Sequence, residues 1–204
     1  MSRAALSVLG TICGLVAVLS TAACGALDLT ADPAQPAAVA DQSLAPTPWG
    51  PLSAVDKKLL MLVRQTSIRE ITTSQWAEEW SASPLVKQAA EMIITQHVQL
   101  ENEDADVATK LGITLPDQPS ADMMTWMNKL KTERGAAFDA DYTNTLRQAH
   151  GAALILTATV RADTQNSLMR TFADSARDFI HNHIQMLENT GIVNYPMLPV
   201  PSAS

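Results

Sequence analysis

The sequence predicts an all-α protein, a ferritin-like antiparallel four-helix bundle with a short extra helix in the long crossover between core helices two and three. Three observations predict this fold. Only three of the 11 prolines, Pro84, Pro116 and Pro119, lie between residues 53 and 191, and none interrupts a helix interior. Apolar residues in this region recur at three- to four-residue spacing, which is typical of amphipathic helices. No strand pattern accompanies them.

The expected helices cover residues 53–81, 84–111, 120–133, 136–163 and 166–190. The first opens on a capping box at Ser53, and the second opens on Ser83 followed by Pro84. Gly112 and Gly191 follow two helix ends, where a left-handed residue is favoured. The turns after the first and fourth helices are too short for anything except antiparallel neighbours. The long connection between residues 112 and 135 therefore forms the crossover.

Residues 1–23 have the features of an export signal. Arg3 precedes an apolar stretch, small residues follow, and the pattern ends at Cys24. This resembles a bacterial lipobox, in which the cysteine is lipidated, although Thr21 stands where leucine is usual. Simple secretion after cleavage near Ala23 and an uncleaved single-pass anchor are the alternatives. We expect an exported protein, held by lipid on the extracytoplasmic side of a membrane.

Proline-rich segments flank the predicted bundle. Residues 24–52 contain five prolines among Ala, Asp and Gln without apolar periodicity, which predicts a tether. The sequence predicts the bundle over residues 53–191 and a disordered tail over residues 192–204. The whole chain has 14 basic and 21 acidic residues, a net charge of −7, with no basic run. Nucleic acid is therefore excluded as a partner.

Each long helix carries, on its otherwise apolar face, one polar residue of a type that can bind a metal. These residues are Glu70, His97, His150 and His183. Counting from the turns puts all four at similar heights, so we expect them to converge at mid-bundle. Imidazole and carboxylate groups on facing helices form the metal sites of helical bundles. Glu101, one turn after His97, could add a fifth ligand or orient that imidazole.

The character of this predicted site follows from its ligands. The Glu-x-x-His pairs of di-iron bundles are missing, because Ile94 and Ile180 precede the histidines of their helices by three residues. A histidine-rich set with one carboxylate favours a single zinc, copper or iron ion. His181 has polar neighbours at helical spacing and is expected on the surface.

Two further classes of function stay open. The histidines and Glu70 could satisfy one another in the core without any ion, which would make the protein a structural or interaction lipoprotein. An enzyme is less favoured, because no motif marks a nucleophile and there is no phosphate-binding glycine loop.

From Lys57 to Leu187 the sequence resembles the bacterial domain-of-unknown-function family numbered 4142, whose members are exported ferritin-like bundles. The matching stretches are Ile68-Arg69-Glu70-Ile71, Ser83-Pro84-Leu85-Val86-Lys87, Gln96-His97, Gly112-Ile113-Thr114-Leu115-Pro116, Ala137-Phe138-Asp139 with Tyr142, Ala149-His150, and His183. The resemblance places the family's recurring acidic and histidine positions on the four residues already found by periodicity. Thr72 and Gly151 stand where the family commonly has glutamate, which argues further against di-metal chemistry. Gly151 is expected to permit close helix approach beside His150.

Overall fold

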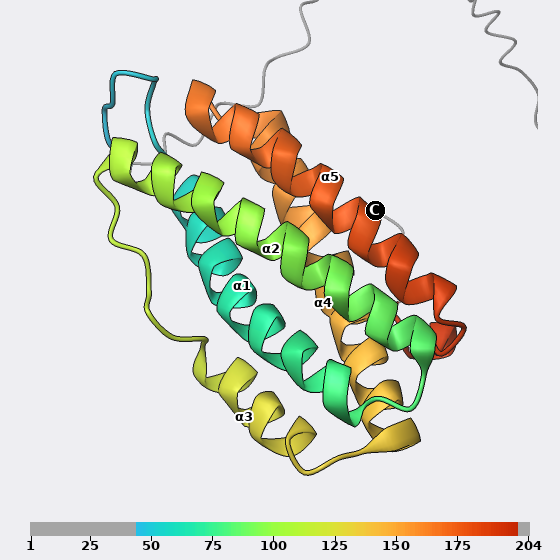
Figure 1. The fold of residues 1–204 in the computed structure, drawn as a ribbon. Coiled ribbons are helices and arrows are strands. Elements are labelled where there is room, and N and C mark those ends of the chain that lie inside the picture. The colour runs from blue at the N-terminus through green and yellow to red at the C-terminus, as the bar shows by residue number, and fades with distance from the viewer. Residues whose placement is uncertain (1–43, 200–204) are drawn as a thin grey trace, which may run out of the picture. The chain divides into compact units, whose positions relative to one another are not determined.

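The computed structural model describes residues 44–199, and all named secondary-structure elements in this range are helices (Figure 1). Its elements are α1 (Ala54–Trp80), α2 (Pro84–Leu111), α3 (Ala121–Leu130), α4 (Gly135–Asp163), α5 (Ser167–Asn189) and the 3-10 helix η1 (Tyr195–Met197). All five predicted helices are present, and the largest difference in their bounds is the earlier end of α3. The predicted signal segment 1–23, Cys24 and the tether up to residue 43 lie outside the described residues.

The four long helices form a ring in the order α1, α2, α5, α4, with each helix packed on the next. After α2 the chain returns along the bundle to α3, which packs against α1 and α4 before α4 begins (Figure 1). Because this crossover spans the bundle, all neighbouring long helices are antiparallel. The all-α bundle predicted from the sequence is therefore confirmed, with the short helix in the predicted crossover.

Capping residues define several of the helix ends. Ser53 Oγ accepts the Asp56 amide at 3.0 Å and Asp56 Oδ2 accepts the Ser53 amide at 2.8 Å, the reciprocal bonds of a capping box. Asn166 Oδ1 accepts two amides of the first turn of α5. Gly112 ends α2 in the left-handed conformation at φ 68°. The signals that predicted these ends thus act through ordinary capping contacts.

Two apolar clusters fill the bundle, one toward each end. The first contains Leu59, Val63, Leu100, Val160 and Phe172, and the second contains Ala77, Ile93, Phe138, Leu146 and Leu187 among others. On every long helix, the inward polar residue found by periodicity lies in sequence between members of the two clusters. The core is therefore interrupted at mid-height by a polar layer.

The prediction that residues 24–52 form an extended tether is wrong for residues 44–52. Residues 44–52 form a turn closed by backbone hydrogen bonds between Ala45 and Leu52 of 3.0 and 2.8 Å, and Leu52 is buried in the first apolar cluster. Asn166 Nδ2 donates to Thr47 Oγ1 at 3.0 Å and to the Gly50 carbonyl at 2.9 Å. We call residues 44–52 the N-terminal strap, because these contacts fasten them to the turn between α4 and α5.

Two smaller expectations also need correction. The predicted tail begins with folded residues, since Ile192 packs on the second apolar cluster and the Asn194 amide donates to Asn144 Oδ1 at 2.7 Å. At Gly151, an added Cβ would meet only the Arg147 guanidinium of the same helix, at 3.4 Å. Gly151 therefore does not serve a close approach between helices.

The strap makes a prediction about Gly50. Its φ is 101°, and a Cβ there would clash with the carbonyl oxygen of Gln165. Gly112 also has positive φ but open space around it. Gly112→Ala therefore measures the cost of the left-handed backbone conformation alone, which is about 1–2 kcal/mol for Ala. We expect Gly50→Ala to lower the free energy of unfolding in urea by at least about 1 kcal/mol more than Gly112→Ala. Equal losses would show that the strap does not contribute to stability.

Candidate metal centre

The structure brings together the four residues that periodicity singled out, one from each long helix. Glu70 of α1, His97 of α2, His150 of α4 and His183 of α5 each offer a ligand atom, and these four atoms all lie within 4.8 Å of one another. All four side chains are buried. The polar layer between the apolar clusters is thus a compact group of three imidazoles and one carboxylate.

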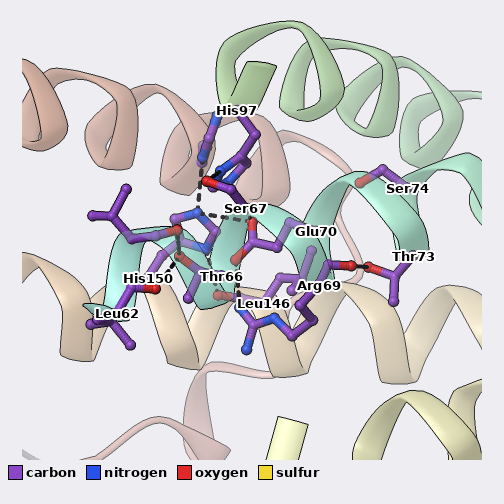
Figure 2. A network of polar contacts seen from close by, with 12 residues as sticks. Leu62, Thr66, Ser67, Arg69, Glu70, Thr73, Ser74, His97, Leu146 and His150 are labelled. Carbon is purple, nitrogen blue, oxygen red and sulfur yellow. Dashed lines mark hydrogen bonds and ion pairs between the residues drawn. The ribbon is translucent and has the colours of Figure 1, made fainter. Parts of the chain in front are cut away.

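Glu70 Oε2 lies between two of the imidazoles (Figure 2). It is 3.0 Å from His97 Nε2 and 3.4 Å from His150 Nε2. His150 Nε2 is in turn 2.9 Å from His183 Nδ1. The lone pairs of several ligand atoms therefore share one small volume at the bundle axis.

The far sides of two imidazoles are held by atoms of their surroundings. His150 Nδ1 lies 2.8 Å from the Leu146 carbonyl, which can only accept, so this nitrogen carries the proton and Nε2 presents a lone pair to the centre. His97 Nδ1 lies 3.0 Å from Ser67 Oγ, a hydroxyl that can donate or accept (Figure 2). Such outer contacts fix the tautomer and ring orientation of metal-binding histidines.

The four side chains do not satisfy one another completely. When His183 Nδ1–H donates to His150 Nε2, the lone pair of His183 Nε2 remains, and this buried atom has no hydrogen-bond partner among residues 44–199. Neutral His150 Nε2 also lies 3.4 Å from Glu70 Oε2, and neither of these two atoms carries a proton to donate to the other. Unpartnered buried acceptors cost free energy. A cation among these atoms would satisfy them, so the residues fit a metal ion.

Arg69 determines which oxygen of Glu70 is available. Its guanidinium donates to Glu70 Oε1, and both side chains are buried. The same guanidinium lies over the Trp126 ring of α3, with its carbon 5.6 Å from the ring centroid. Glu70 is thereby left with one free oxygen, Oε2, facing the histidines. The arginine also balances the charge of the carboxylate.

The surroundings also set the protonation states. Burial alone would raise the pKa of Glu70, but favourable electrostatic interactions with His150, His97 and Arg69 bring that pKa well below its usual range. Burial lowers the pKa of His150 despite the attraction of Glu70. Burial, aided by charge on the neighbouring histidines, lowers the pKa of His183 to about 2. Glu70 is therefore ionised, and His150 and His183 are neutral, the forms in which these groups bind metals.

Glu101 does not join this group. Its carboxylate forms an ion pair with Arg64, and both side chains are partly exposed. The expected fifth ligand is therefore wrong, and Ser67 occupies the orienting position beside His97 that Glu101 was expected to take. His181 is exposed and contacts Gln185, as expected for a surface residue.

Ser67 and Arg69 belong to the site but were not predicted from the sequence. Ser67 lies three residues before Glu70 on the inward face of α1, so its spacing could have indicated it. Arg69 lies off that row, and only its length brings the guanidinium back to the carboxylate.

The profile of a family described as Domain of unknown function (DUF4142) matches residues 41–190. This range covers most of the 204-residue chain. The protein belongs to the DUF4142 family. The DUF4142 match includes the N-terminal strap and all four residues of the polar group. No significant match is found among curated proteins or among solved structures.

None of the helices within residues 44–199 has both the length and the apolar run needed to cross a membrane.

Another buried carboxylate, outside the candidate centre, lies on α2. Asp104 is two turns beyond His97 on the same helix face, is fully buried, and both of its oxygens lack hydrogen-bond partners within the described residues. Burial raises its pKa to about 7, although the nearby Arg64 charge opposes this. Asp104 is not among the residues that converge on the candidate centre. It is therefore a carboxyl group that destabilises the fold when it ionises.

We expect Asp104→Asn to reverse this destabilisation. A carboxyl whose pKa is raised in the folded state binds its proton more tightly there, so folding loses stability as pH rises from about 4 through 7. At pH 8 the variant should exceed wild type by about 1–3 kcal/mol in urea unfolding, and the difference should vanish near pH 4. Asp106→Asn, at an exposed site two residues away, should show no such trend. A difference that does not depend on pH would contradict this assignment.

Proposed function

We propose that this protein binds a single transition-metal ion, zinc, copper or iron, at the centre of its bundle. The observation that carries the proposal is the convergence of four buried ligand atoms, one from each long helix, within 4.8 Å. The ligands would be Glu70 through Oε2 and one nitrogen each of His97, His150 and His183. An affinity for metal is the activity that this chemistry supports best, and no reaction is assigned to it.

The spacing of the donors supports an ion of this kind. Bonds of about 2.0–2.2 Å in a tetrahedral arrangement place neighbouring donors roughly 3.4 Å apart. Glu70 Oε2 lies 3.0 Å from His97 Nε2 and 3.4 Å from His150 Nε2, and the four ligand atoms all lie within 4.8 Å of one another, so modest side-chain movements would reach this spacing. Nitrogen-rich donor sets suit zinc, copper and iron, whereas magnesium and calcium prefer oxygen. A single carboxylate, already held by Arg69, favours one ion over two.

His97 could bind the ion as a neutral imidazole by changing tautomer. In the tautomer with its proton on Nε2, Nε2–H donates to Glu70 and Nδ1 accepts from Ser67. If Nε2 held the ion, the imidazole would carry its proton on Nδ1 instead, and Nδ1–H would then donate a hydrogen bond to the serine hydroxyl. Ser67 is thus suited to both states, because a hydroxyl can reverse its role.

We expect zinc to raise the melting temperature of wild-type protein, since an ion that binds only the folded state stabilises it by mass action. His97→Ala should weaken zinc binding in calorimetry by more than about 100-fold, because loss of a ligand should cost more than loss of an outer contact. His181→Ala, at an exposed histidine of the same chain, should bind zinc as wild type does. If no variant, wild type included, binds zinc, copper or iron, the histidines serve packing alone and the protein is a structural or interaction protein.

We also propose that the protein is exported and anchored to a membrane by lipid on Cys24. The support is the sequence of residues 1–24: a positive charge, an apolar stretch, small residues and a cysteine. Cys24 would be the single thiol of the mature chain, because Cys13 lies in the segment that is removed. Lipidation gives this thiol a function.

Anchoring can be tested in cells that express the full chain. Cys24→Ser should move the protein from the membrane fraction to the soluble fraction and abolish labelling by palmitate. Cys13→Ser is the matched control, since that residue precedes the cleavage position, and it should leave both readouts unchanged. Membrane association and labelling that persist in Cys24→Ser would contradict the proposal.

A further inference from the structure

A cavity of about 310 Å³ leads from the surface to the candidate metal centre. All four proposed ligands line it, together with apolar side chains from the four long helices. Its apolar walls include Leu59, Leu62, Val63, Leu100 and Leu156. The cavity is thus apolar along its length and has metal-binding groups among its walls.

The cavity opens between α1 and α4. Its border there carries residues that are exposed or half-buried: Lys58, Leu62 and Thr66 of α1, and Ala149, Ala152, Ala153 and Leu156 of α4. Three of the four on α4 are alanines, which are too short to fill the space between the helices. The crossover helix α3 packs on both α1 and α4, and its Met123 contributes to the cavity lining. The alanines therefore keep open the part of the α1–α4 gap that the crossover helix leaves free.

The charges around the cavity favour an anion. Its charged lining residues are Lys58, Arg69 and Glu70, and the last two neutralise each other. Lys58 forms no ion pair with any residue in 44–199, so the lining carries a positive charge before any metal binds. A divalent ion would add two positive charges. A negatively charged head group is the natural complement to such a centre.

We infer that this cavity binds an aliphatic monocarboxylate, with the carboxylate at the metal and the alkyl chain along the apolar walls. The inference rests on the proposed metal site and names the ligand class that the site would take. The wall on α1 from Glu70 back to Leu59 extends about 16 Å at the helical rise, which accommodates a medium-length chain. Lys58 at the border attracts the anion toward the opening. Zinc can expand from four to five ligands, so the carboxylate would add to the four protein ligands.

Calorimetry on purified, zinc-loaded protein tests this inference with hexanoate, octanoate, 1-octanol and octyltrimethylammonium. Each methylene buried in an apolar cavity raises affinity about fourfold, so octanoate should bind about 15-fold more tightly than hexanoate. The alcohol and the cation have the same chain length, and both should bind at least about tenfold more weakly than octanoate. Removal of zinc with a chelator should reduce octanoate affinity by a similar factor.

Two variants of α4 separate the cavity from the metal site. Ala153→Leu fills the cavity and should abolish octanoate binding while zinc affinity stays that of wild type. Ala158→Leu places the same side chain at an exposed position outside the lining and should change neither affinity. Zinc binding without octanoate binding, or octanoate binding unaffected by Ala153→Leu, would overturn this inference and leave the metal site standing. Failure of wild type to bind zinc would overturn the metal site and this inference together.

Discussion

Glu70 buries a carboxylate at the centre of the bundle, where all four long helices meet. An ionised carboxylate inside a bundle needs positive or hydrogen-bonding partners, and Arg69 and His97 supply them directly. The arginine is itself buried and needs a cover, which Trp126 of the crossover helix provides. The crossover helix thus encloses part of the polar layer, and beyond it the alanines of α4 leave the cavity open. The buried carboxylate, its arginine partner and the crossover helix are therefore connected by direct contacts, and the cavity lies beside them.

The helices and the four converging residues could be predicted because their signals are local or periodic. Prolines and glycines mark helix ends through backbone conformation, and the 3.6-residue period identifies the inward face. Glu70 and His97 stand out on that face because polar side chains there interrupt an apolar row. Short turns then fix the relative heights of neighbouring helices, so counting residues was enough to predict convergence.

Contacts that depend on the reach of a side chain or on distant partners could not be predicted. The N-terminal strap folds because Asn166 bonds to Thr47 and Gly50, a contact between segments more than one hundred residues apart. Glu101 has helical spacing from His97, but spacing does not reveal that its carboxylate turns to Arg64. The cavity depends on which surface of α4 the crossover helix leaves uncovered, and no local or periodic sequence pattern reveals where that helix packs.

X-ray absorption at the zinc edge of the zinc-loaded protein identifies the atoms around the ion, and so tests whether the three histidines bind it together. We expect nitrogen and oxygen neighbours at about 2.0–2.2 Å. We also expect multiple scattering from three imidazole rings, one each from His97, His150 and His183. A spectrum with oxygen neighbours and no imidazole scattering would place the ion at a surface carboxylate and contradict the proposed site.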